Sequence, residues 1–197
     1  MQEISILVPD NIPDLMISYL NELNRDLEDQ FDDRTVHQDA KVLAWACVQE
    51  MYRPATIKWE TVIAALAARG EKAEEHLQYL EERLRLIYTI GATKDRLHFS
   101  LDPLAEYLAG LHLIDLYNGD ETQWLEFLEK TETLLDHSAA SSGFLRAVFD
   151  CCLARSKETK ISPLILTKLT QIQSETSQLI AAQTSIKEDL ILEKSLN

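Results

Sequence analysis

The sequence predicts a mainly α-helical fold with a single β-hairpin, and three observations carry this prediction. Hydrophobic residues make up 46% of the 197 residues and recur at three- and four-residue spacing through most of the chain. Glycine and proline number only five each, which is too few for the many turns of a sandwich or barrel. The stretch 86–100 breaks the helical pattern, because alternating and β-branched residues there flank a polar turn.

The N-terminal part reads as short elements separated by helix-breaking residues. Ile4–Val8 is a β-like run that Pro9 ends, and Asp14 is expected to cap the helix that follows. The polar, acidic stretch 24–34 forms the end of that helix and a linker. Residues 1–34 are therefore interpreted as the end of an upstream helical domain. Three more helices are predicted over residues 36–51, 58–69 and 73–86.

A β-hairpin follows these three helices. Its strands are predicted at 86–90 and 96–100, and Gly91–Asp95 supplies the turn. Three helices followed by a two-stranded hairpin is the element order of a winged helix-turn-helix, which we place at residues 35–101. The break at Gly70 fits the turn between the second and third helices of such a domain.

The remainder, residues 102–197, is predicted to be a C-terminal helical bundle. Asp102 is expected to cap its first helix, with Pro103 as the first helical residue. Later helices are predicted over 120–135, 143–155 and 162–192. Apolar residues on the last helix approximate a stripe, which consists of Leu164, Leu166, Leu169, Ile172, Leu179, Ile180 and Ile186. This stripe either packs back on the chain or pairs with a second chain, and the sequence leaves both open.

The charge balance argues against anionic partners. Nineteen basic residues are set against 33 acidic ones, and the net charge of −14 opposes nucleic-acid backbones and anionic membrane surfaces at long range. The third predicted helix, which a DNA-binding winged helix would place in the major groove, carries more acidic than basic residues. Lys94 and Arg96 are basic residues of the hairpin, so a DNA-binding regulator is kept as an alternative.

No catalytic motif or metal-ligand spacing is present. The glycines are too far apart for a phosphate-binding loop, and no Cys-x-x-Cys or His-x-x-x-His pair exists. Cys47, Cys151 and Cys152 do not form a disulfide framework and suggest reduced thiols in a cytoplasmic protein. Because Cys151 and Cys152 are adjacent on a predicted helix, at most one is expected to face the core. Neither a signal peptide nor a membrane span is recognisable in the sequence.

A family resemblance is carried by the end of the hairpin and the helix after it. The residues there are Asp95-Arg96-Leu97-His98-Phe99-Ser100-Leu101-Asp102-Pro103-Leu104-Ala105-Glu106-Tyr107-Leu108-Ala109-Gly110. This stretch resembles the end of the winged-helix domain in NACHT proteins of bacterial, cyanobacterial type, which are STAND NTPases related to NOD-like receptors. Ile12–Arg25, Tyr52–Thr56 and Tyr79–Leu84 are similar to the same family, so the resemblance covers residues 10–135.

The resemblance implies a nucleotide-sensing lid. In the family an upstream P-loop domain binds ADP or ATP, and the winged helix folds over it. A histidine near the end of the second wing strand then contacts the β-phosphate of ADP. His98 matches this position and is the candidate nucleotide-sensing residue. Glu106 and Tyr107 follow His98 at a longer spacing than in the family, so Leu101 is the alternative match.

The resemblance therefore implies a regulatory module that is not itself an enzyme and holds no cofactor. Its expected partners are the upstream nucleotide-binding domain and a downstream sensor domain of a larger parent, which would bind ADP or ATP. The module would couple the nucleotide state to other domains in signal transduction. The alternatives are a DNA-binding winged-helix regulator and a free-standing helical adaptor that self-associates through residues 161–192.

Overall fold

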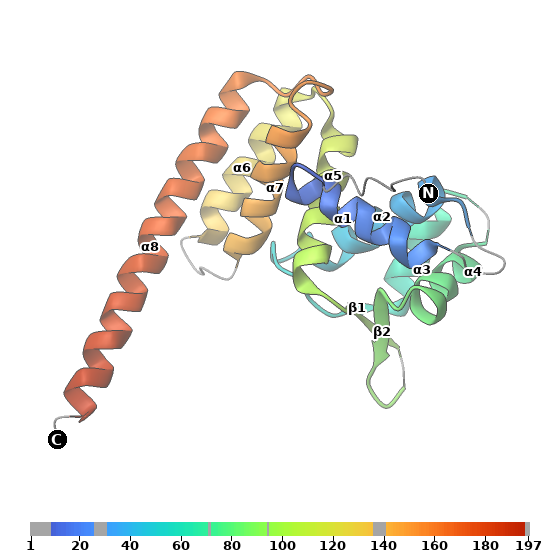
Figure 1. Ribbon diagram of the computed structural model, residues 1–197, viewed down its shortest axis with the longest axis horizontal. Helices are drawn as coiled ribbons and strands as arrows, with labels where there is room; N and C mark the ends of the chain where they lie inside the picture. The colour runs from blue at the N-terminus through green and yellow to red at the C-terminus, as the bar shows by residue number, and fades with distance from the viewer. Residues whose placement is uncertain (1–8, 26–30, 71, 94, 136–140, 196–197) are drawn as a thin grey trace, which may run out of the picture.

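The computed structural model of the protein describes residues 9–25, 31–70, 72–93, 95–135 and 141–195, and helices dominate them (Figure 1). The helices are α1 (Ile12–Asn24), α2 (Asp33–Val48), α3 (Trp59–Ala67), α4 (Ala73–Gln78), the π-helical η1 (Tyr79–Arg83), α5 (Asp102–Tyr117), α6 (Glu121–Leu135), α7 (Ser142–Ala154) and α8 (Pro163–Ser195). The strands are β1 (Ile57–Lys58), β2 (Ile87–Ile90) and β3 (Arg96–Phe99). The predicted mainly α-helical fold with one hairpin is confirmed. The predicted strand Ile4–Val8 lies outside the described residues.

The hairpin belongs to a three-stranded antiparallel sheet with the order β1-β3-β2. The sequence analysis predicted β2 and β3 but missed β1. A two-residue strand is too short to show a periodicity, and it exists because β3 offers a free edge. Ile57 pairs with Leu97, and Lys58 pairs with Arg96.

The cap of α1 is Asn11, so the prediction that Asp14 caps this helix was wrong. The Asn11 side-chain oxygen accepts a hydrogen bond from the Asp14 backbone N–H at 2.9 Å, and its Nδ2 donates to Asp14 Oδ2 at 2.7 Å. Pro13 explains the difference, because proline is favoured in the first helical turn and the cap must precede that turn. The cap of α5 is Leu101, one residue before the predicted Asp102.

Helix α2 ends at Val48, before the predicted end at Met51. Tyr52 then adopts a positive φ of 50°, which reverses the chain and turns the Tyr52 ring into the core. The ring packs near Phe127 and Phe144, with centroid distances of 5.1 and 5.5 Å. Met51, the last residue of the predicted helix, is 49% exposed.

Helix α5 is the central helix of the molecule. It packs against α2 on one side and α7 on the other (Figure 1). Most of its residues between Leu104 and Ile114 are buried, as expected of a helix that is covered on more than one face. Gly110 lets α7 approach closely, because a Cβ at this position would lie 3.3 Å from the Val148 backbone and 3.2 Å from Cys151 Sγ.

Cys151 and Cys152 are both fully buried, so the expectation that at most one of them faces the core was wrong. Adjacent helical residues point about 100° apart, and both directions are inward only when a helix is covered on two sides. Helix α7 meets this condition, since α5 and α8 both pack on it. The sequence predicted both of these helices but did not indicate that they pack on α7.

The first half of α8 packs back on the molecule. Its buried residues are Ile165, Leu169, Ile172 and Thr176, at three- and four-residue spacing. The predicted stripe included Leu164, which is instead 48% exposed. Leu166 is partly buried against the core, and the side chains of Leu179, Ile180 and Ile186 lie outside the described part. Figure 1 shows that the backbone of α8 continues beyond the ends of α6 and α7.

A search of the described residues for helices long and apolar enough to cross a membrane returns none.

Replacing Gly110 by valine should destabilise the protein strongly. The added side chain would push against the Val148 backbone, which cannot move aside as a flexible side chain would. We expect the free energy of unfolding in urea to fall by about 2–3 kcal/mol. Gly70→Val is the matched control, because a Cβ at Gly70 would meet no atom within 4 Å. Equal stability of the two variants would contradict the close α5–α7 contact.

The three cysteines should resist alkylation in the native protein. Burial raises the pKa of the Cys47 and Cys152 thiols to about 12 and that of Cys151 well above its ordinary value. The thiolate is the reactive form, so iodoacetamide should label none of the three at neutral pH. Intact mass should rise by three adducts only after guanidinium is added. Fast labelling without denaturant would show that the packing opens readily, around α2 for Cys47 or around α7 for Cys151 and Cys152.

Candidate functional site

His98 lies on the face of the sheet that points away from the core. Its neighbours Leu97 and Phe99 are buried, so alternation along β3 turns His98 outward, where it is half-buried. Tyr88 of β2 is its cross-strand partner. The two rings stack, with centroids 5.5 Å apart and an interplanar angle of 22°.

The imidazole of His98 is oriented by the backbone of the next residue. Nδ1 lies 2.6 Å from the carbonyl oxygen of Phe99. A carbonyl oxygen only accepts hydrogen bonds, so Nδ1 carries the proton and donates it. No described residue makes a hydrogen bond with Nε2, which leaves this nitrogen for a ligand. A phosphate oxygen also only accepts, so Nε2 donates to phosphate when the ring is an imidazolium.

Leu101, the alternative match, occupies the N-cap position of α5. Its side chain is 49% exposed and has no polar atom with which to bind a phosphate. Of the two residues, His98 alone therefore offers the required chemistry. Which of them corresponds to the family's histidine stays a prediction.

Tyr88 was missed as a member of this site. The pairing register of the hairpin would have identified it, because Ile90 lies opposite Arg96 on either side of the turn. Two residues further from the turn on each strand, residue 88 lies opposite residue 98 on the same face. The register of the hairpin thus identifies Tyr88 as the residue whose ring stacks on His98.

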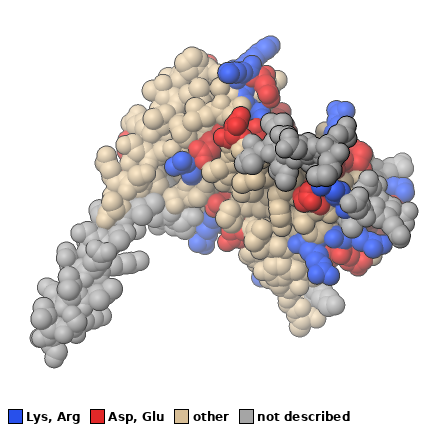
Figure 2. All heavy atoms as spheres, viewed as in Figure 1, with Lys and Arg blue, Asp and Glu red and all other residues tan. Residues whose placement is uncertain are grey.

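A groove of about 970 Å³ lies beside the sheet, between η1, the start of α3 and the hairpin. Its charged lining consists of Lys58, Arg85, Glu60, Glu81, Glu82 and Asp95. Figure 2 shows basic and acidic side chains next to one another around the base of the hairpin. Glu81 is already engaged, since it accepts hydrogen bonds from the backbone N–H and the hydroxyl of Thr89. The groove is therefore more acidic than basic.

Glu106 and Tyr107, which carry part of the family resemblance, lie at the interface between α5 and α7. The Tyr107 hydroxyl donates to Asp150 Oδ2 at 2.7 Å, and Arg146 pairs with the same carboxylate. Burial raises the pKa of Tyr107, so its hydroxyl stays protonated and keeps donating. Tyr107 is thus a packing residue that joins α5 to α7.

The Glu106 carboxyl is half-buried and lies against Gly143 in the first turn of α7. An added Cβ at position 143 would come within 2.7 Å of Glu106 Oε2, so the Glu106 carboxyl would have to move to admit a larger residue. Burial raises the pKa of Glu106 to about 7, and the nearby negative charge of Asp102 adds to the rise. The protonation state of this carboxyl therefore changes near neutral pH.

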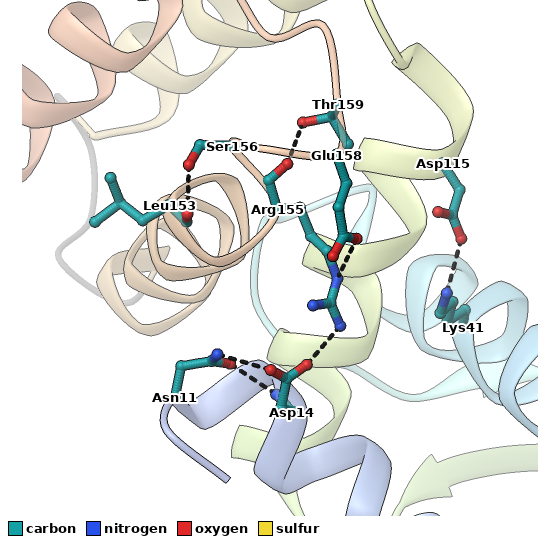
Figure 3. Close-up of polar contacts among 9 residues, drawn as sticks. All are labelled: Asn11, Asp14, Lys41, Asp115, Leu153, Arg155, Ser156, Glu158 and Thr159. Atoms are coloured by element: carbon teal, nitrogen blue, oxygen red, sulfur yellow. Dashed lines mark hydrogen bonds and ion pairs between the residues drawn. The ribbon is translucent and has the colours of Figure 1, made fainter.

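A polar bridge joins α1 to the end of α7 (Figure 3). Arg155 Nη2 donates to Asp14 Oδ1 at 2.6 Å, and Glu158 flanks the same guanidinium with an Nε–Oε2 distance of 3.9 Å. Burial raises the pKa of Asp14, but the hydrogen bonds from Arg155 and Asn11 outweigh it and lower the pKa overall. Arg155 carried no signal in the sequence, since its partner lies 141 residues away.

The described residues contain no group of three or more histidine, cysteine or acidic side chains that could hold a metal ion.

The comparison with protein families matches residues 142–173 to the NACHT C-terminal Helical domain 4. This segment comprises α7 and the first part of α8. The searches of curated proteins and of solved structures returned no match. The matched segment lies outside residues 10–135, where the family resemblance was seen, and it points to the same kind of protein. Residues 142–173 thus form a NACHT-related helical region.

Replacing Glu106 by glutamine should change how stability depends on pH. An unfolded glutamate loses its proton near pH 4.5, whereas folded Glu106 keeps it until about pH 7. Between these values the folded state binds more protons, so the stability of the native protein falls as pH rises and levels off above pH 7.

The Glu106→Gln variant lacks this pH-dependent contribution. Its stability relative to the native protein should therefore rise between about pH 4.5 and pH 7. After allowance for solvent screening of a half-buried group, the relative gain should be on the order of 1–2 kcal/mol. Urea unfolding at several pH values measures it, and Glu132→Gln on the exposed face of α6 is the control. Parallel profiles for the native protein and Glu106→Gln would contradict the raised pKa.

Proposed function

We propose that residues 33–99 form a winged helix. The order of elements supports this, since α2, β1, α3, α4 with η1, β2 and β3 follow one another as in that fold. The sheet order β1-β3-β2 supports it as well, because the short first strand pairs with the last one. In this proposal β2 and β3 are the wing, and the outward face of the wing carries His98.

We further propose that the chain is a non-catalytic regulatory module of a NACHT-type signal-transduction NTPase. The observation that carries this proposal is the packing of the NACHT-related segment on α5. Helix α5 begins directly after the strand that holds His98. The nucleotide-sensing candidate and the matched helical segment are therefore parts of one continuous packed structure, as a relay requires.

The proposed mechanism is a lid whose position depends on the bound nucleotide. An upstream nucleotide-binding domain would hold ADP or ATP, and the outward face of the wing would close over it. With ADP, the His98 imidazolium donates from Nε2 to a β-phosphate oxygen, which is a charge-assisted hydrogen bond. With ATP the added γ-phosphate changes this contact and releases the lid, so the two nucleotides bias a two-state element.

The relay to a downstream sensor domain would run through α5. A movement of the sheet pulls on the start of this helix, and α5 is packed against α7 without space to slide. The ion pair between Arg155 and Asp14 joins the end of α7 to α1, which would lie next to the upstream domain. In this view the chain works in the cytoplasm of a bacterial cell, as members of the resembling family do.

DNA binding is the weaker alternative for a specific reason. The groove that adjoins the wing is lined by four carboxylates and two basic side chains. A duplex lying across it would bring phosphates against the carboxylates, which removes most of the electrostatic affinity that DNA binding needs.

The proposal predicts nucleotide-dependent binding to the upstream domain. Isothermal titration of this chain against the purified domain should give an affinity about tenfold higher with ADP than with ATP. His98→Phe should abolish the difference, because phenylalanine keeps the stack on Tyr88 but donates no hydrogen bond. Leu101→Ala is the control and should retain it. Equal binding in ADP and ATP would refute the lid, and a loss with Leu101→Ala alone would favour the other alignment.

A further inference from the structure

A pocket of about 240 Å³ lies between the end of α2, the end of α5 and helix α6. Its walls are the aromatic side chains of Trp45, Tyr52, Tyr117 and Phe127. Gln49, Glu126 and Lys130 belong to its polar lining. The rings of Tyr52 and Phe127 are buried, whereas those of Trp45 and Tyr117 are half-buried and reach solvent. The pocket is therefore an aromatic one with a polar rim.

The face of the Tyr52 ring already holds a cation. Lys130 Nζ lies 4.9 Å from the centroid of this ring and donates a hydrogen bond to the Gln49 carbonyl oxygen at 3.1 Å. An ammonium group is attracted by the negative face of an aromatic ring. Lys130 makes no ion pair within the described part of the chain. The ring and the carbonyl are thus the groups that hold its charge.

The backbone strengthens the preference for positive charge. Gln49 is the C-cap of α2, and the carbonyl groups at the C-terminal end of a helix carry the negative part of the helix dipole. Tyr52 has a positive φ of 50°, a conformation that costs energy in a residue with a side chain. This conformation fixes the Tyr52 ring beneath the ammonium group. Strained residues of this kind are concentrated at ligand sites.

The side chains around the rim act in the same direction. Glu126 lies one helical turn before Lys130 on α6 and brings an exposed carboxylate to the pocket. Burial raises the pKa of Tyr52 and Tyr117, and the charge of Glu126 raises that of Tyr117 further. Both hydroxyls therefore stay protonated, and the rings act through their neutral faces. An anion would be repelled by the carboxylate and by the end of the helix.

We propose that this pocket binds a small organic cation of the primary alkylammonium class, and that Lys130 occupies it when that ligand is absent. Lys130 can leave easily, because its side chain is exposed and is held through one hydrogen bond and one ring contact. The ammonium group of the ligand takes over both contacts, and its alkyl chain packs against Trp45 and Tyr117. Pockets for drug-sized ligands begin at about 300 Å³, so the ligand is no larger than a side chain.

The test is a titration of the ¹⁵N-labelled chain with n-butylammonium chloride at pH 7, followed through the indole N–H signals. The Trp45 signal should shift as the pocket fills. The Trp59 signal should not shift, because Trp59 lines the groove beside the sheet. 1-Butanol has the same alkyl chain without the charge and should bind about tenfold more weakly. Equal binding of 1-butanol, or tighter binding of butyrate, would overturn the inference.

Substitutions test whether Lys130 competes with the ligand. Lys130→Ala should tighten the binding of n-butylammonium about fivefold, because the ligand no longer has to displace a cation of the chain. Lys157→Ala is the matched control, since it removes the same charge from an exposed position after α7. Glu126→Gln should weaken the binding about threefold. Equal affinity of the native chain and Lys130→Ala, or the same gain with Lys157→Ala, would contradict the proposal.

A last comparison identifies the source of the ammonium group. The two probes are 1,5-diaminopentane and a tripeptide with lysine between two alanines, blocked at both ends. Saturation of the Trp45 shift at a lower concentration of the diamine would support a free amine as the ligand. Saturation at a lower concentration of the tripeptide would support a lysine side chain of a partner protein. No Trp45 shift with either probe would overturn the proposal.

Discussion

The rest of the structure depends on the close packing of α5 between α2 and α7. Gly110 favours it, because a Cβ at this position would lie only 3.3 Å from the Val148 backbone and would force α7 to shift slightly. This contact buries α5 on opposite faces and fixes α7 in place. Helix α7 in turn covers both cysteines and supports the first half of α8. A central helix covered on both sides is costly to distort, since protein interiors are packed without free volume.

This packing gives the proposed relay a physical basis. The sheet that presents His98 is continuous in sequence with α5, and α5 is in contact with the NACHT-related segment. Polar contacts add to the apolar ones at both ends, through Tyr107 with Asp150 and through Arg155 with Asp14. Because α5 begins soon after β3 and packs on α7, the proposed relay would pass a displacement of the hairpin to α7 through this one helix.

His98 and its neighbours on the sheet differ in how far the sequence could predict them. The family resemblance made His98 the sensing candidate, and the structure puts this residue on the outward face of β3. Strand β1 could not be connected with β3, because β1 has only two residues and pairs with a strand nearly forty residues later. Tyr88 could have been connected with His98 by counting the register from the turn. The resemblance thus pointed to the histidine, and pairing across the sheet supplied its neighbours.

The sequence by itself determined the helical class, the hairpin and the absence of metal-ligand spacing, because these depend on the order and periodicity of nearby residues. Tertiary structure decided what local pattern does not encode. Tyr52, at a positive φ, places its ring in the core while Met51 is exposed, and coverage of α7 from two sides buries Cys151 and Cys152 together. Each of these outcomes depends on which element lies opposite, and that is fixed only when the whole chain has packed.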